Sequence, residues 1–180
     1  MIYCVDLDGT LIKNDMSVTS FWYCIRHNPF IIFMCIIWYF KGKRALLKLE
    51  LSKRYNFSAK ALNYNESLIS WLKCQASKGD KIYLISGSTT TIVKKISDNF
   101  DFFSGNYGST IKINLTGTNK LNFITKTFSS TNEICYIGNS KVDLKVWLGT
   151  SHGIIVSNDD KLIQQAKKLT IILKVFRNCW

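Results

Sequence analysis

Short apolar runs alternate along the chain with longer segments in which apolar residues recur at helical spacing. The short runs favour β structure and have no polar face, so they predict buried strands at 2–5, 81–85, 133–137, 153–156 and 171–173. Helical spacing covers 65–78, 89–99, 121–128, 144–147 and 159–169. Strands that alternate with helices in this way predict an α/β sandwich with a mainly parallel sheet.

Capping and turn residues predict the structure of two further segments. After the first strand, Ser17 or Thr19 can cap a helix that ends at Asn28-Pro29. Between 100 and 114 we expect short extended segments, with turns at Gly105-Asn106 and Gly108.

The apolar run at 30–40 is eleven residues long and has no polar interruption. It is shorter than the roughly 20 residues that cross a bilayer, so we expect a helix buried on several sides. The alternative is a helix that lies on a membrane, with Lys41, Lys43 and Arg44 at its rim. Residues 43–54 then predict a separate, basic amphipathic helix.

Polar residues follow three of the predicted strands at the point where each strand ends. Asp6 and Asp8 lean to the same side in extended structure, and two carboxylates beside a turn suit a hard cation and a phosphate. One can attack phosphorus while the other handles the proton of the leaving group. Ser86 and Gly87 offer a hydroxyl and free N–H groups at a strand-to-helix turn, which can hold an anion. Because the carboxyl ends of parallel strands share one edge, Asp6, Ser86 and Asn139 should meet there.

Composition and charge narrow the class of protein. With 47% hydrophobic residues and one proline, the 180 residues suffice for one domain, or for a core with a modest insertion. The six cysteines show no zinc or redox pattern and no signal peptide is visible, so we expect buried, reduced thiols in a cytoplasmic protein. The net charge is +12, and residues 17–60 carry eight basic side chains against Glu50 alone. These basic residues suit an anionic substrate or an anionic membrane, or they form a solvated charged surface. They contain no recognisable nucleic-acid-binding motif.

The stretch Asp6-Leu-Asp-Gly-Thr10 resembles the first motif of the haloacid-dehalogenase (HAD) superfamily, whose members are mostly Mg²⁺-dependent phosphatases. The resemblance implies that Asp6 is the nucleophile that forms an aspartyl-phosphate. It also implies that Asp8 protonates the leaving group and later activates water. Ser86, followed by Gly87, is similar to the second motif, which holds the transferred phosphoryl group.

Two later motifs resemble the family with one departure each. The closest-looking relatives have the pattern Asn-Leu-Lys-Gly-x-x-Lys, and this chain has Thr116 at the first lysine and Lys120 at the second. Lys120 is one helical turn later, so it either reaches the phosphate or is an ordinary exposed lysine. Gly138-Asn-Ser-Lys-Val-Asp143 resembles the fourth motif, with Asn139 in place of its first acid. The resemblance implies a Mg²⁺ site formed by Asp6, Asp8, Asn139 and Asp143.

The likeness is closest to the HAD-type domain that precedes UbiA-type polyprenyl transferases in some bacterial proteins. It implies a three-layer Rossmann-like core, 1–12 and 65–180, with a small helical cap inserted at 13–64. We therefore expect a Mg²⁺-dependent phosphatase for a small phosphorylated metabolite or a lipid or sugar phosphate, with peripheral contact to an anionic membrane. Thr116 and Asn139 motivate the alternative, a catalytically weakened HAD module that binds a phosphorylated ligand, a partner or an anionic membrane.

Overall fold

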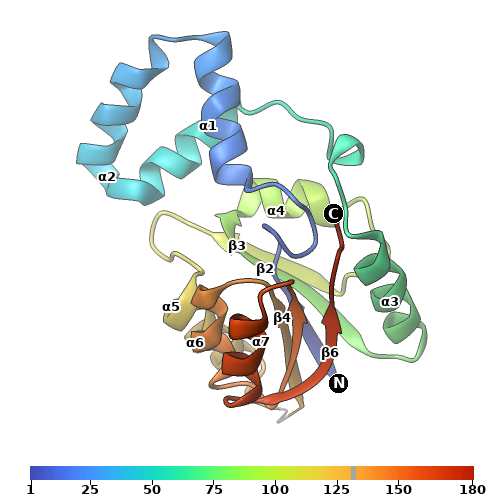
Figure 1. Cartoon of the computed structure of the whole chain (residues 1–180). Helices are drawn as coiled ribbons and strands as arrows, with labels where there is room; N and C mark the ends of the chain where they lie inside the picture. Colours follow the sequence, from blue (N-terminus) through green and yellow to red (C-terminus); the bar gives the residue numbers. More distant parts are fainter. Residues whose placement is uncertain (131–132) are drawn as a thin grey trace.

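The computed structural model describes residues 1–130 and 133–180, which form one parallel sheet with helices on both faces (Figure 1). The strands are β1 (Ile2–Val5), β2 (Lys81–Thr89), β3 (Gly105–Ser109), β4 (Ile134–Gly138), β5 (His152–Val156) and β6 (Ile171–Phe176). Their order in the sheet is β3-β2-β1-β4-β5-β6. The structure thereby confirms the predicted α/β fold with a Rossmann-like sheet.

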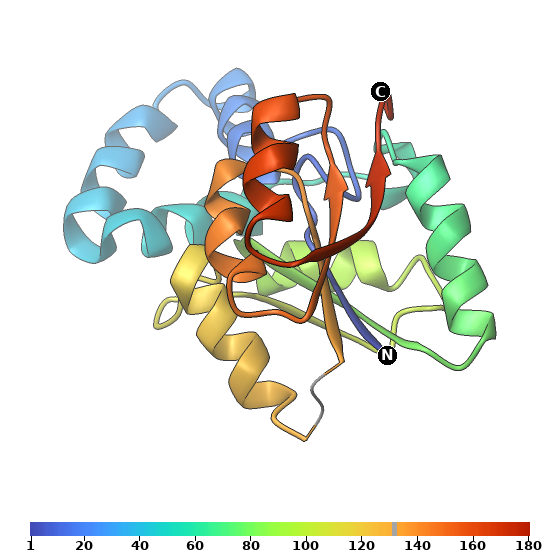
Figure 2. The same cartoon turned by 60° about the horizontal axis from the view of Figure 1, so that its bottom comes forward.

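The helices of the core lie in two layers, one on each face of the sheet (Figure 2). One layer holds α3 (Glu66–Ser77) and α4 (Thr90–Ser97), and the other holds α5 (Gly117–Thr127), α6 (Leu144–Trp147) and α7 (Asp160–Lys167). A short 3₁₀ turn, η2 (Lys141–Asp143), leads from β4 into α6. The alternation of side chains along β1 separates the layers, because Tyr3 and Val5 pack against α3 and α4 whereas Cys4 packs on the opposite side.

Strand β1 lies in the middle of the sheet, and its end determines where polar residues gather. Val5 is level with Leu84 of β2 and with Ile137 of β4. The backbone N–H of Asp6 donates to the carbonyl oxygen of Ile137 at 2.9 Å, which continues the pairing by one residue. The segments that follow these strands therefore begin side by side at the carboxyl edge.

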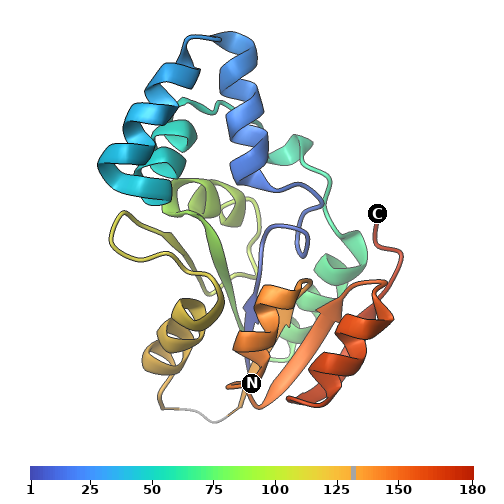
Figure 3. The same ribbon diagram turned by 60° about the vertical axis from the view of Figure 1, so that its left-hand side comes forward.

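Two long helices, α1 (Met16–His27) and α2 (Ile31–Arg54), stand beyond the end toward which the strands point (Figure 3). The expected cap of α1 at Ser17 or Thr19 is wrong. The carboxylate of Asp15 caps the helix by accepting from the N–H groups of Ser17 at 2.8 Å and Val18 at 3.0 Å. A carboxylate at this position also lies at the positive end of the helix dipole, which favours the earlier start.

The expected burial of 30–40 is also wrong. Ile31, Cys35 and Trp38 are buried in a small cluster with α1, but Phe33 is 66% exposed and Phe40 is 82% exposed. The reason is that α1 covers only one stripe of α2, and the sheet lies too far away to cover the rest (Figure 3). The structure has one helix from Ile31 to Arg54 where two were expected, and this helix bends along its length (Figure 1). The side chain of Lys43 lies outside the described residues.

Within the part of the chain that the structure describes, no helix combines the length and the apolarity needed to cross a bilayer.

The predicted turns at Gly105-Asn106 and Gly108 are wrong, since these residues form β3. At Gly108 a Cβ atom would lie 2.5 Å from the backbone nitrogen of Thr90, and at Gly105 it would lie 3.2 Å from the Tyr83 ring. Both glycines therefore allow a close approach to a neighbouring element, which a strand glycine can serve as well as a turn glycine.

The cysteines are free thiols, and their burial is as expected for Cys4, Cys24, Cys35 and Cys135. The expectation of burial is wrong for Cys74, which is exposed on α3, and for Cys179, which is only half-buried.

Two stretches of chain join the α1–α2 pair to the sheet, and they run beside each other. Ile12 forms an isolated antiparallel bridge with Tyr64. The N–H of Lys13 donates to the carbonyl oxygen of Asn63, and the N–H of Asn65 donates to that of Leu11, each at 2.9 Å. The outgoing and returning chain are thus held together at one place. The proposed boundaries of a core and a cap stay a prediction.

Candidate active site

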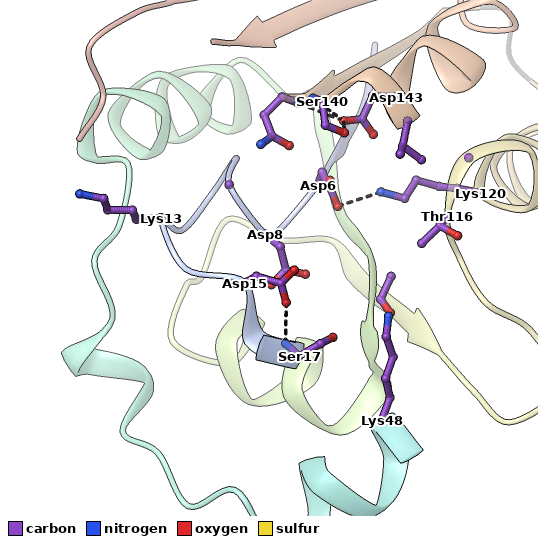
Figure 4. A pocket seen from close by; sticks show the side chains of 15 residues that line it. Asp6, Asp8, Lys13, Asp15, Ser17, Lys48, Thr116, Lys120, Ser140 and Asp143 are labelled. Atoms are coloured by element: carbon purple, nitrogen blue, oxygen red, sulfur yellow. Dashed lines mark hydrogen bonds and ion pairs between the residues drawn. The ribbon is translucent and has the colours of Figure 1, made fainter. Parts of the chain in front are cut away.

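A pocket of about 360 Å³ opens at the carboxyl edge of the sheet. Its wall combines residues that follow β1, the end of β2, the segment after β4, and the first turn of α5 (Figure 4). The side chains and glycines used below are Asp6, Asp8, Gly9, Lys48, Gly87, Thr116, Lys120, Asn139 and Asp143. The predicted convergence of three distant loops is therefore the arrangement that the structure has, with Gly87 rather than Ser86 on the wall.

An ion pair between Asp6 and Lys120 lies at the base of this pocket (Figure 4). The Nζ atom of Lys120 is 2.8 Å from Oδ1 of Asp6, and Lys120 is only 3% exposed. Burial raises the pKa of the Asp6 carboxyl to about 7, against the opposing influence of the Lys120 charge. Of the two alternatives for Lys120, the structure excludes an exposed surface lysine.

The start of helix α5 explains how Lys120 reaches Asp6, although Thr116 replaces the first lysine of the family pattern. Thr116 is the residue before α5, and Lys120 lies in the first turns of that helix, facing inward. Residues four apart share a helix face, so a lysine one turn later points to the same side as the missing one would. Gly117 adopts a φ of 51°, which lets the chain turn sharply into the helix.

A buried tyrosine extends this ion pair into a network. The hydroxyl of Tyr136 accepts from Nζ of Lys120 at 2.8 Å and donates to Oδ1 of Asp143 at 2.6 Å. Oδ2 of Asp143 accepts from the N–H of Asn139, and from the N–H and hydroxyl of Ser140 at 2.9 and 2.8 Å. Both oxygens of Asp143 are therefore engaged with protein donors, and Asp143 fixes the 139–140 loop. Its role as a metal ligand stays a prediction. Burial, followed by the nearby carboxylates, raises the pKa of Tyr136 well above its usual value, so Tyr136 stays protonated.

The carboxylate of Asp8 points toward the first turn of α1 (Figure 4). Its Oδ1 accepts from the N–H of Met16 at 2.8 Å, and its Oδ2 accepts from the hydroxyls of Ser88 at 2.8 Å and Ser86 at 3.2 Å. Asp6 and Asp8 thus line the same pocket, but their carboxylates are held by different sets of donors. Burial raises the pKa of Asp8, and the donors from Met16, Ser88 and Ser86 oppose that rise.

Ser86 is fully buried behind the pocket wall, and its neighbour Gly87 faces the opening. A Cβ atom on Gly87 would lie 2.6 Å from Cγ2 of Thr116, so only glycine lets these two segments approach so closely. The carbonyl oxygen of Gly87 accepts from Nζ of Lys48 at 3.2 Å. This bond brings a cation from α2 to the pocket.

Asn139 approaches the turn after β1 closely. A Cβ atom on Gly9 would lie 2.2 Å from Nδ2 of Asn139, and Gly9 has a φ of 72°, so this position requires glycine twice over. Oδ1 of Asn139 accepts from the hydroxyl of Thr10 at 3.2 Å. The amide is thereby held at the edge of the pocket, on the side of Asp6.

The donor set fits a hard cation. Carboxylate and amide oxygens of Asp6, Asp8 and Asn139 line the pocket, and neither a thiol nor an imidazole is among its lining residues. Such oxygens suit Mg²⁺ better than Zn²⁺, which favours nitrogen and sulfur ligands. Among the described residues, no group of three His, Cys, Asp or Glu side chains is arranged to hold a metal by itself. A cation here would therefore depend on the amide oxygen, on main-chain oxygens, on water and on a bound phosphate.

Sequence reasoning missed Lys48 and Tyr136. Lys48 lies in a basic helix in which many lysines look alike, and only the path of α2 brings it over the pocket. Tyr136 has a weak signal: it is the one side chain with an oxygen or nitrogen atom within the run Ile134-Cys-Tyr-Ile137, a strand buried on both sides. A hydroxyl in such a strand needs a buried partner.

Known proteins resemble this chain mainly in fold. No family model matches the sequence. An uncharacterised protein of Sinorhizobium fredii, y4nM, is 31% identical over 156 residues, which make up 87% of this chain and 30% of that protein. The chain thus spans less than a third of this relative.

Two solved structures show the same fold. A HAD family hydrolase of Salmonella enterica serovar Typhi superposes with a TM-score of 0.65 at 16% identity, over 96% of this chain and 66% of that one. A phosphoserine phosphatase, solved as an analogue of its phospho-aspartyl intermediate, has a TM-score of 0.57 at 12% identity, over 97% and 92% of the two chains. The fold of this chain is therefore the fold of HAD hydrolases.

Proposed function

We propose that this chain is a phosphomonoester hydrolase of the HAD superfamily that works through an aspartyl-phosphate on Asp6. The observation that carries the proposal is the buried Asp6–Lys120 pair at the base of a pocket formed by three strand ends. A carboxylate held ready beside a fixed cation can attack phosphorus while the cation neutralises the phosphoryl oxygens. The shared fold with a phosphatase solved as a phospho-aspartyl analogue supports this reading.

Asp6, Asp8 and one water molecule supply the protons and electron pairs of the reaction. The Asp6 carboxylate attacks phosphorus, and the bond from phosphorus to the ester oxygen breaks. Asp8, whose pKa burial raises, gives its proton to the departing oxygen. Asp8 then takes a proton from water, the resulting hydroxide attacks phosphorus, and the bond to Asp6 breaks to release phosphate. Both carboxyl groups return to their starting states.

Other residues hold this arrangement in place. Lys120 sits beside Asp6 throughout, and Asp143 keeps Tyr136 and the Asn139 loop in position. Mg²⁺, held by Asp6 and Asn139 with the turn at Asp8, would supply positive charge to the phosphoryl oxygens when bound.

The pocket and its surroundings suit a small phosphorylated substrate. A volume of about 360 Å³ is at the lower end of ordinary ligand sites. Lys48 and Lys120 supply positive charge for a phosphate beside the aspartates of the pocket, and the chain carries a net charge of +12. We infer a phosphorylated metabolite or a lipid or sugar phosphate, of which the pocket takes the phosphate end.

The test is the variant Asp6→Asn, assayed for Mg²⁺-dependent hydrolysis of an aryl phosphate. Turnover should be abolished even well below the melting temperature of the variant, in which the amide oxygen can still accept from Lys120. Asp101→Asn, at an exposed acid, is the matched control and should keep full turnover. Unchanged turnover in Asp6→Asn would exclude Asp6 as the nucleophile. A wild-type protein that binds phosphate without turnover would favour the non-catalytic binding module instead.

A further inference from the structure

The first half of α2 exposes a continuous set of large apolar side chains, called here the apolar tip. Its members are 42% to 82% exposed. They are Phe30, Ile32, Phe33, Met34, Ile36, Ile37, Tyr39 and Phe40.

The pattern of burial shows that the apolar tip faces outward around most of the helix. The buried residues Ile31, Cys35 and Trp38 recur at i, i+4 and i+7, which is the stripe packed against α1. The remaining positions of the run are all apolar and all exposed. Soluble proteins rarely leave an apolar surface of this kind open, and such surfaces mark sites of contact with a membrane or another molecule.

The charge around the apolar tip indicates the sign of its partner. Arg26, Lys41 and Arg44 are exposed at its two ends. From residue 16 to residue 65 the sequence has a single acid, Glu50, and that side chain is paired with Lys53 at 2.6 Å and with Arg54 at 2.7 Å. The partner should therefore carry negative charge around an apolar interior.

We propose that the apolar tip docks on an anionic lipid membrane, with its aromatic and aliphatic side chains in the interface and its basic residues at the head groups. The run of 30–40 is about 16 Å long as a helix, roughly half of the hydrocarbon thickness, so it can lie in one leaflet. Each basic residue near an anionic surface adds attraction to the apolar contact. A second copy of the chain fits less well, because two tips that meet would bring basic residues of the same sign together.

A groove connects the apolar tip to the pocket. This groove has a volume of about 520 Å³ and is lined by Tyr39 of the tip and by Arg44, among others. It shares Lys48, Thr116 and Val142 with the lining of the pocket. A membrane under the tip would therefore place lipid at one end of a path that leads to Asp6. Together with the proposed phosphatase activity, on which this part rests, the path implies an amphiphilic phosphomonoester as the substrate class.

Vesicle sedimentation tests the docking without reference to activity. The probes are vesicles of phosphatidylcholine alone and of phosphatidylcholine with phosphatidylglycerol. The wild-type chain should bind the anionic vesicles, and binding should weaken with added salt and with pure phosphatidylcholine. The double variant Phe33→Glu with Phe40→Glu changes two exposed residues on one side of α2, and each change should lower the partition by roughly tenfold. Leu148→Glu, at a residue 67% exposed on the core, is the matched control and should bind like the wild type.

Three results would overturn the docking. They are a wild-type chain that ignores anionic vesicles, a double variant that binds as well as the wild type, and a dimer in solution that the double variant dissociates. The substrate class has its own readout: the double variant should lose turnover of phosphatidic acid in vesicles while it keeps turnover of an aryl phosphate. Hydrolysis of the aryl phosphate but not of phosphatidic acid by the wild type would overturn the substrate class, and equal turnover of the vesicle substrate by both proteins would overturn delivery by the tip. Binding without turnover of either substrate would support the docking and refute the phosphatase.

Discussion

Replacing Lys120 with methionine should destabilise the protein strongly and in a pH-dependent way. Nζ of Lys120 is 2.8 Å from Asp6, and the two side chains are 4% and 13% exposed. Removal of one member of a buried ion pair costs about 3–5 kcal/mol, because the other charge stays buried without compensation. In a domain of this size that loss lowers the melting temperature by roughly 10 °C.

The pH dependence follows from the pKa of Asp6. Burial already raises it to about 7, and Lys120 is the group that opposes the rise, so Lys120→Met moves the pKa further up. An acid whose folded pKa lies above its unfolded value of about 3.9 binds more protons when folded, so stability falls as the pH rises toward the folded pKa. In the variant the free energy of unfolding continues to fall above pH 7, whereas in the wild type the fall is complete at about pH 7. The deficit of the variant should therefore be small at about pH 6 and full at about pH 9.

Chemical denaturation of both proteins at the two pH values measures this deficit. Lys94→Met is the matched control, since Lys94 pairs with Asp98 at 3.0 Å on the surface, where the side chains are 65% and 55% exposed. An exposed pair of this kind contributes about 0.3–0.5 kcal/mol, so the control should change little at either pH. The reasoning is refuted if Lys120→Met loses the same free energy of unfolding at both pH values, or no more than the control loses.

Three further outcomes follow from the site. Turnover of an aryl phosphate at low Mg²⁺ should fall as the pH drops below about 7, because Asp6 attacks only when ionised; a flat profile down to about pH 5 would contradict this. Gly9→Ala should lower the free energy of unfolding by about 1–3 kcal/mol, because a Cβ atom would meet Asn139 at 2.2 Å in a backbone conformation that favours glycine. The same change should lower turnover, because it displaces Asn139 at the pocket. Lys48→Met should raise KM about tenfold with little change in the melting temperature, whereas Lys53→Met, on an exposed part of α2, should leave KM unchanged.

The sequence was informative wherever one local rule decided the structure. An apolar run that stops at a polar residue predicts a buried strand with a functional end, and β1 with Asp6 and β4 with Asn139 follow that rule. The residues at those ends meet because parallel strands share an edge, which topology alone guarantees.

The rest depends on what lies opposite each segment in space. Nothing local distinguishes an apolar helix inside the core from one that stands outside it, so the burial of 30–40 was predicted wrongly. The same holds for Gly108, which sits in a strand because the Thr90 backbone is close, and for Lys48, which α2 carries to the pocket. The sequence left open whether Lys120 reaches the site or is exposed. Its position in the helix predicts the side of the helix on which it lies, but not what that side contacts.

The bridge between Ile12 and Tyr64 holds together the two chain segments that connect the α1–α2 pair to the sheet. The same pair also touches the pocket directly, because Met16 bonds to Asp8 and Lys48 bonds to Gly87. A contact made at Phe33 or Phe40, at the other end of the pair, is therefore connected through α1 and α2 to bonds on the pocket wall. Whatever the far end rests on would thus control how readily the space above Asp6 opens and closes.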